Sequence, residues 1–258
     1  MHPHRLGKPR PHVGLYAQRS SFKSHESISP DCHWQNLWVR IQRYTLLESC
    51  LSTASRKRQK LCVNCCVPTP ELLQYHPGLF DTNEQLALFG ALQDEIPWTQ
   101  THITLFGKTH PTPRLTAWHG DPHCVYTYSG VENQPLPWTP SLLTIKNRIE
   151  SLTPGATFNC VLLNFYRDGS DKMGWHSDDE KELGPNPSIA SVSFGATRRF
   201  DFKHKTEANN KFSIHLESGS LLLMQGDMQH HWLHQIPAQK RIQEPRINLT
   251  FRHIPVQV

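Results

Sequence analysis

The sequence predicts an α+β protein whose strands form a sandwich or jelly roll. Two helical segments precede a long series of short strands, and turns rich in Gly and Pro separate these strands. The chain has 258 residues, which is long enough to bury a sizeable core without disulfides. One large domain or two small ones are therefore expected.

The first helix is predicted to begin after Asp81 and to end before Pro97. Asp81 and Glu84 have the spacing of a capping box, in which each side chain accepts a hydrogen bond from the other's backbone. Three apolar residues follow at helical spacing: Leu86, Phe89 and Leu92.

The second helix is predicted to begin at Thr139 and Pro140, because Pro is favoured at the first helical position. Pro154 and Gly155 end it. Its expected buried stripe consists of Leu142, Ile145, Ile149 and Leu152.

Short strands are predicted throughout the rest of the chain, since β-branched and aromatic residues alternate with turn residues there. The expected strands are 158–166, 189–194, 199–203, 212–216, 220–224 and 247–251.

The first 66 residues differ in composition from the rest. They hold 11 of the 27 Lys and Arg residues, only 3 of the 22 Asp and Glu residues, and five of the seven cysteines. We expect residues 1–66 to be a poorly ordered basic extension and residues 67–258 to be the folded domain. The basic net charge belongs to this extension, so it is no argument that the domain binds nucleic acid.

Two other interpretations of this extension are open. The basic run 56–60 is typical of a nuclear-import or nucleic-acid-binding tail, and Cys62, Cys65 and Cys66 are a candidate metal site. Zinc usually needs four ligands from two such clusters, and here there is only one cluster, which disfavours the metal site.

The composition also indicates a cellular setting. Mean hydropathy is −0.54, no apolar run is long enough to span a membrane, and no secretory signal is recognisable. Seven unevenly spread cysteines favour a reducing compartment. We expect an intracellular protein with no membrane partner, cytoplasmic in a bacterium and nuclear in a eukaryote.

One candidate metal site begins at His176 and Asp178. On an extended segment, residues two apart point to the same face, so an imidazole and a carboxylate would lie together. A third ligand from the segment 230–234 would give two histidines and one carboxylate, a set that binds iron and leaves three positions open. Spacing alone leaves both His231 and His234 as candidates.

A second candidate feature is the strictly alternating segment 246–252. Its odd-numbered residues, Ile247, Leu249 and Phe251, are expected to face the core. The opposite face would carry Arg246, Asn248, Thr250 and Arg252, a row suited to binding carboxylates. By itself, such a row is more often the solvated outer face of a strand.

These motifs, in this order, resemble the AlkB family of Fe(II)- and 2-oxoglutarate-dependent dioxygenases, which remove alkyl lesions from nucleic-acid bases. The similar segments lie within residues 70–255: 164–169, 175–180, 189–198, 231–234 and 245–252. At one position the chain departs from the pattern, since Phe165 stands where many relatives carry a basic residue.

The resemblance implies a double-stranded β-helix, which is a cupin-like jelly roll, with outer helices and a nucleotide-recognition hairpin region. It implies that His176, Asp178 and His234 bind Fe(II). It further implies that Arg246 and Arg252 bind the two carboxylates of 2-oxoglutarate, with Asn164, Tyr166 and Thr250 as further hydrogen-bond partners. Dioxygen is the remaining cosubstrate.

The resemblance also implies a set of substrate contacts. Leu105, Phe106, Gly107 and Lys108 would form a hairpin wedge that enters the base stack, although a Phe buried in a hairpin core is ordinarily the better interpretation. The segment Tyr126, Thr127 and Tyr128 would bind the extruded base, with Tyr126 stacking on it. Asp179 would contact the Watson–Crick edge of that base, and Lys240 and Arg241 would contact phosphates.

We therefore expect a monomeric enzyme that oxidatively demethylates 1-methyladenine and 3-methylcytosine in single- or double-stranded DNA. RNA is the second nucleic-acid partner to consider, and it belongs to the first alternative. That alternative is an RNA demethylase or a hydroxylase of proteins or small molecules with the same iron site. The others are a nucleic-acid-binding module with a vestigial site and, last, a zinc hydrolase, in which the two arginines would have no role.

Overall fold

The computed structural model describes residues 72–105, 107–128 and 131–256. The predicted basic extension, its cysteines and Phe106 lie outside these residues. Within them, no helix is long and apolar enough to cross a membrane.

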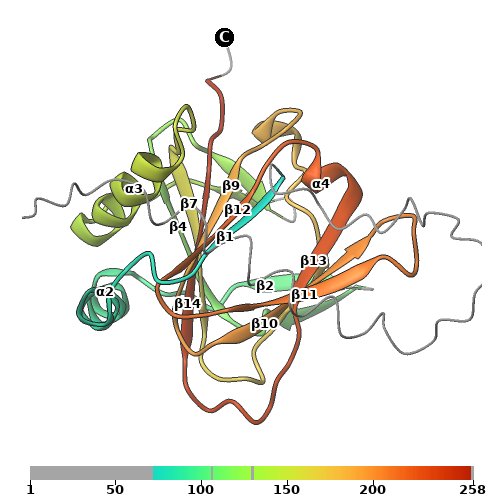
Figure 1. Cartoon of the computed structure of the whole chain (residues 1–258), viewed down its shortest axis with the longest axis horizontal. Helices are drawn as coiled ribbons and strands as arrows, with labels where there is room; N and C mark the ends of the chain where they lie inside the picture. Colours follow the sequence, from blue (N-terminus) through green and yellow to red (C-terminus); the bar gives the residue numbers. More distant parts are fainter. Residues whose placement is uncertain (1–71, 106, 129–130, 257–258) are drawn as a thin grey trace, which may run out of the picture. The chain divides into compact units, whose positions relative to one another are not determined.

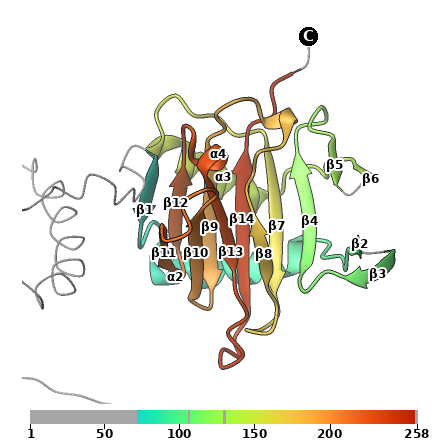
Figure 2. The ribbon, with the colours of Figure 1, turned by 90° about the vertical axis from the view of Figure 1, so that its right-hand side faces the viewer.

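A six-stranded antiparallel sheet forms the centre of the domain, in the order β1-β12-β9-β14-β7-β4 (Figures 1 and 2). Its strands are β1 (Leu73–His76), β12 (Ser220–Met224), β9 (Ile189–Gly195), β14 (Arg246–Arg252), β7 (Cys160–Tyr166) and β4 (Leu115–Gly120).

A four-stranded sheet faces this major sheet, in the order β11-β10-β13-β8. Its strands are β11 (Lys211–Leu216), β10 (Arg198–His204), β13 (Trp232–Ile236) and β8 (Met173–His176). Two sheets with crossover connections confirm the predicted jelly-roll α+β fold.

Two hairpins lie beyond β4 in Figure 2. They are formed by β2 (His102–Leu105) with β3 (Lys108–Pro111), and by β5 (Tyr126–Tyr128) with β6 (Val131–Asn133).

Helices α2 (Thr82–Glu95) and α3 (Pro140–Leu152) lie on the side of the major sheet away from the minor sheet (Figure 1). The predicted capping box is confirmed: the Asn83 and Glu84 N–H groups donate to Asp81 Oδ1, and the Asp81 N–H donates to Glu84 Oε2. Two shorter helices are η1 (Lys181–Leu183) and α4 (Met228–His231).

The expected helical stripes are only partly buried. Leu92, Leu142, Ile145 and Ile149 are fully buried, whereas Leu86 is 70% exposed and Leu152 is 46% exposed. The expectation that Leu152 is buried was wrong, because the helix ends there beyond the apolar layer.

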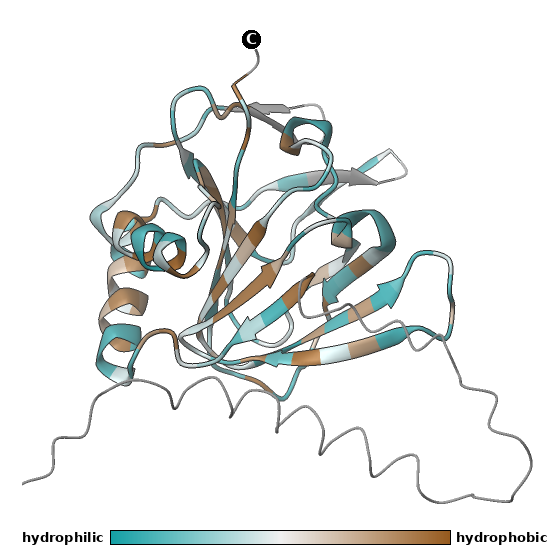
Figure 3. Cartoon of the chain, turned by 45° about the horizontal axis from the view of Figure 1, so that its top comes forward, coloured by the Kyte–Doolittle hydropathy of each residue, from teal (hydrophilic) through white to brown (hydrophobic). Residues whose placement is uncertain are grey.

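Two hydrophobic clusters lie on the two faces of the major sheet. One fills the space between that sheet and the helices. The other contains residues of both the six-stranded and the four-stranded sheet. Apolar residues follow the helices and the central strands in Figure 3, and hydrophilic residues are frequent in the loops. The space between the two sheets is where the candidate site lies.

Candidate metal centre and its cavities

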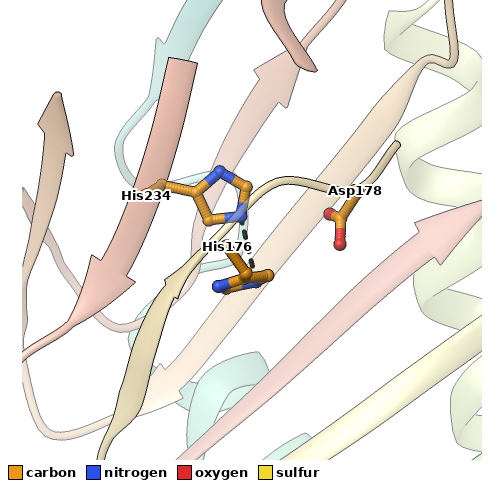
Figure 4. A group of neighbouring side chains, drawn as sticks. All are labelled: His176, Asp178 and His234. Carbon is orange, nitrogen blue, oxygen red and sulfur yellow. Dashed lines mark hydrogen bonds between the residues drawn. The ribbon is translucent and has the colours of Figure 1, made fainter. Parts of the chain in front are cut away.

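Three side chains from two neighbouring strands converge between the sheets (Figure 4). His176 ends β8, Asp178 lies in the loop that follows, and His234 lies on β13 directly opposite His176. Their ligand atoms all lie within 4.8 Å of one another, and the two Nε2 atoms are 3.1 Å apart. The residues predicted to bind the metal therefore come together.

The structure distinguishes His234 from the other candidate. The His231 side chain is 55% exposed, and its Nε2 lies 3.5 Å from Asp227 Oδ2 outside the cluster. His234 is only 3% exposed. Spacing left this choice open, and the pairing of β13 with β8 decides it in favour of His234.

The protonation of Asp178 and His234 suits a divalent cation. Burial opposes ionisation of Asp178, but the Arg252 guanidinium and the nearby histidines hold the pKa of that carboxyl at about 2. Burial, together with His176, lowers the pKa of His234 to about 3. At neutral pH the site therefore holds a carboxylate and an uncharged imidazole, both of which are metal ligands.

Backbone geometry fixes the ring of His176. Its Nδ1 lies 2.9 Å from the Gly174 carbonyl oxygen. A carbonyl only accepts, so Nδ1 carries the proton of the neutral ring and Nε2 has a lone pair. That lone pair faces His234, whose Nε2–H is the donor in this contact. To bind a metal through Nε2, the neutral ring of His234 would carry its proton on Nδ1 instead.

The row of polar residues on β14 faces the interior. Arg246, Asn248, Thr250 and Arg252 are all 8% exposed or less, so they do not form a solvated outer face. Arg252 donates through Nη2 to Asp178 Oδ1 at 2.7 Å, which joins the row to the metal cluster.

Arg246, at the other end of the row, has unused hydrogen-bonding capacity. Its Nη2 donates to Ser193 Oγ at 2.9 Å, and its guanidinium lies 5.2 Å from the centre of the Tyr166 ring. Among the described residues, its buried Nε and Nη1 have no hydrogen-bond partner. Burial lowers its pKa to about 10, so it is still a cation at neutral pH. A buried cation with orphaned donors suits a carboxylate ligand.

A narrow inner cavity adjoins the metal cluster, and Arg246 is not among the residues that line it. Its lining includes the metal cluster and four of the five predicted cosubstrate residues: Asn164, Tyr166, Thr250 and Arg252. Phe165 points the other way, with its ring 5.3 Å from that of Trp98 in the helix-side layer. Its departure from the family pattern therefore leaves the cavity unchanged.

A second cavity, of about 210 Å³, opens beside the metal cluster. It shares five lining residues with the inner one, namely His176, Asp178, Arg252, Leu162 and Met173. The remaining lining residues are Thr99, Thr101, Arg114, Thr116, Ala117, Trp118, Ser177 and Glu180.

Arg114 was missed by the sequence reasoning. It is 6% exposed, and its Nε donates to Asn164 Oδ1 at 2.7 Å. Among the described residues, no carboxylate pairs with it. The alternation along β4, with Thr116 and Trp118 on the cavity face, was the one available signal, and that strand was not predicted.

The predicted wedge lies on a hairpin, as expected. Leu105 ends β2 and pairs with Lys108 at the start of β3, and Gly107 has a positive φ of 75° at the turn. Lys108 is exposed. Thr101, which precedes β2, lines the outer cavity, so the hairpin begins at the cavity wall. Tyr126, Thr127 and Tyr128 form the edge hairpin strand β5.

The other predicted substrate residues lie farther from the cavity. Asp179 accepts a hydrogen bond from Lys205 Nζ at 3.0 Å and is not part of the cavity lining, whereas Glu180 is. Lys240 and Arg241 are exposed in the loop between β13 and β14. Their roles in substrate binding stay predictions.

A family model decides the assignment of this site. The model for the 2OG-Fe(II) oxygenase superfamily matches residues 73–252, which include the metal cluster and the whole arginine row. The chain belongs to the 2OG-Fe(II) oxygenase superfamily. Fe(II), 2-oxoglutarate and dioxygen, as predicted, are the groups that membership implies, and the donor set fits them.

Similar proteins within this superfamily indicate which of its families the chain belongs to. It is 45% identical over 188 residues to rat alpha-ketoglutarate-dependent dioxygenase alkB homolog 3, a match that covers 69% of this chain and 63% of the relative. It is 42% identical over 186 residues to mouse DNA oxidative demethylase ALKBH2, covering 68% and 77%. The resemblance to the AlkB family is confirmed, although the match spans less than two-thirds of the rat protein.

The fold of this superfamily member agrees with a solved relative. The structure of OsALKBH1 superimposes with a TM-score of 0.52 at 18% identity, covering 70% of this chain and 97% of that one. At this identity the match supports the fold alone.

Proposed function

We propose that the chain is an AlkB-type dioxygenase that removes methyl groups from nitrogen atoms of bases in DNA. The observation that carries this proposal is the position of the metal cluster at the boundary between two cavities. The inner cavity holds carboxylate-binding groups, and the outer cavity holds space for a substrate.

The chemistry supplied by bound Fe(II), with 2-oxoglutarate and dioxygen, is hydroxylation of the methyl carbon, with succinate and carbon dioxide as the other products. The hydroxymethyl group then leaves the base nitrogen as formaldehyde, and the nitrogen recovers its ordinary valence. The chain's own residues bind and orient the two substrates.

Binding of 2-oxoglutarate is assigned to the two ends of β14. Arg246 offers two buried donors without a partner to one carboxylate, and Arg252 lies beside the metal cluster to meet the other. Asn164 is held by Arg114, which leaves its amide nitrogen to donate into the inner cavity.

The methylated base would occupy the outer cavity. Trp118, Met173 and Leu162 give it apolar walls, and Arg114 and Glu180 provide polar groups of opposite charge for a base edge. A base whose Watson–Crick edge is methylated is already unpaired, so its extrusion from the stack costs less. The names of the relatives, which include DNA oxidative demethylase, support DNA as the substrate.

The test is incubation of the full chain with Fe(II), 2-oxoglutarate, dioxygen and oligonucleotides containing 3-methylcytosine. We expect equal amounts of succinate and formaldehyde, and we expect both to disappear in His176→Ala. His231→Ala, which changes an exposed histidine outside the cluster, is the matched control and should retain turnover.

Parallel oligonucleotides distinguish the alternatives. Faster formaldehyde release from RNA than from single- or double-stranded DNA would replace the DNA proposal by an RNA demethylase. Tight oligonucleotide binding without succinate would point to a binding module with a vestigial site.

A further inference from the structure

The loop that carries Asp178 is held from outside the metal cluster. Asp178 donates its backbone N–H to the side-chain Oε1 of Gln229 at 3.0 Å. Gln229 lies on α4 and is only 1% exposed. Its own Nε2 lies 3.6 Å from Met224 Sδ, which fixes the amide so that the oxygen faces the loop.

Lys205, just after β10, ties the same two segments together. Its Nζ donates to Asp179 Oδ2 at 3.0 Å and to the Gln229 carbonyl oxygen at 2.9 Å. Its backbone N–H donates to the carbonyl of His231, at the end of α4, at 2.8 Å. One lysine therefore contacts both the metal-binding loop and the helix that supports it.

These contacts hold a different part of Asp178 from the part that Arg252 binds. Arg252 binds the carboxylate, whereas Gln229 binds the backbone of the same residue. Helix α4 also leads directly into β13, which carries His234. The same short element thus supports two metal ligands, one in the loop after β8 and one on β13.

We propose that Gln229 and Lys205 are positioning residues that hold the Asp178 loop in its ligating geometry before the metal binds, and that they thereby set the affinity for the ion. Without them the loop would have to lose conformational freedom when the metal binds, which weakens binding. Partners of this kind commonly change metal affinity 10- to 100-fold. This inference goes beyond the proposed function, because it concerns the metal whatever the substrate.

The contribution of each residue follows from its burial. Removing the Gln229 amide leaves the buried N–H of Asp178 without a partner, so the loop should shift toward solvent. Lys205 is partly exposed, with 28% of its side chain accessible, so its effect should be smaller.

The experiment is a titration of the metal-free full-length chain with Co(II), followed by visible absorption, together with hydrogen exchange of the Asp178 amide. We expect Gln229→Leu to weaken Co(II) binding by about 10- to 100-fold and Lys205→Met by up to about 10-fold. In both variants the Asp178 amide should exchange faster before metal is added. Lys205→Arg keeps donors at this position and should restore most of the affinity.

Lys203 provides the matched control. It lies on β10 two residues earlier, but its Nζ is 4.5 Å from the centre of the Trp175 ring, and among the described residues it makes no hydrogen bond or ion pair with the Asp178 loop. Lys203→Met should leave both Co(II) affinity and Asp178 exchange unchanged.

Three outcomes would overturn the proposal. One is a Gln229→Leu protein with a lower melting temperature but unaltered Co(II) affinity, which would make Gln229 a purely structural residue. Another is a Lys205→Met effect confined to the KM for an oligonucleotide, which would assign Lys205 to the substrate. If Gln229→Leu fails to fold, unchanged Co(II) affinity in Lys205→Met alone overturns it. The titration contains no oligonucleotide, so its result is independent of the demethylase assay.

Discussion

The two faces of β14 are both buried, but one carries apolar side chains and the other carries polar ones. On one face, Ile247, Leu249 and Phe251 are fully buried among the residues that pack against the helices. On the other, four polar residues are buried between the sheets, and one of them, Arg246, has donors without partners. Because the side chains on both faces are buried, the difference is not one of exposure. Burial of the apolar side chains on the helix side stabilises the folded state, whereas the inner side keeps hydrogen-bond donors available for a ligand.

The largest expected effect comes from removing Phe251 on the helix side. Phe251→Ala should lower the free energy of unfolding by about 3–5 kcal/mol, because it leaves a cavity beside Trp138 and Phe158. Urea denaturation measures this loss. The affinity of the folded variant for 2-oxoglutarate should stay near that of the wild type, and a large decrease would show that the two faces are not separable.

Lowering the pH should reduce the free energy of unfolding through His234, which lies on the inner side of the major sheet. The unfolded chain protonates His234 near its ordinary pKa of 6.5, whereas the folded chain does so only near 3. Between these pH values the unfolded state binds more protons than the folded state. The free energy of unfolding therefore falls as the pH drops from 6.5 toward 3, and the total loss is on the order of a few kcal/mol. Denaturation of the metal-free protein across this range measures the slope, and His234→Gln should reduce it. An equal slope in the variant would contradict the assignment.

Arg246 should show opposite effects on function and stability. Arg246→Met removes a buried charge without a carboxylate partner, so the free energy of unfolding should rise by about 1 kcal/mol or more. The same change should raise the KM for 2-oxoglutarate by 10-fold or more, since a charge-assisted pair is lost. A variant that is less stable and still binds 2-oxoglutarate normally would mean that Arg246 is structural.

The smallest effect is expected at Leu86, which belongs to neither face. Its side chain is 70% exposed, so Leu86→Gln should change the free energy of unfolding by no more than about 0.5 kcal/mol. Thermal denaturation beside the wild type is sufficient to measure this. A loss of several kcal/mol would show that Leu86 packs against other residues despite its exposure in this structure.

Local features of the fold were predictable from the sequence. The capping box at Asp81, the proline at the start of α3 and the alternation along β14 depend on neighbouring residues, and all three are confirmed. Of the second sheet, the sequence revealed β10 and β11 as the predicted strands 199–203 and 212–216, but not the two strands that carry or adjoin the metal ligands. The strand containing His234 and the strand ending at His176 were not predicted, because they are short and their pairing joins distant segments.

The candidate site shows the same division. The alternation along β14 placed the arginines on one face, but only the facing sheet shows that this face is buried. Arg114 and Gln229 lie in no recognisable motif, and each contributes through one contact with a residue at least 50 positions away. Such contacts depend on the assembled fold and leave no local pattern.

The central claim is that His176, Asp178 and His234 form a single metal site. Anaerobic equilibrium dialysis of the full chain against Fe(II), with and without 2-oxoglutarate, tests it most directly. We predict one Fe(II) bound per chain, tighter when 2-oxoglutarate is present, and no binding at that site in a variant with all three ligands changed to Ala. Undiminished binding of one Fe(II) by the triple variant would contradict the account.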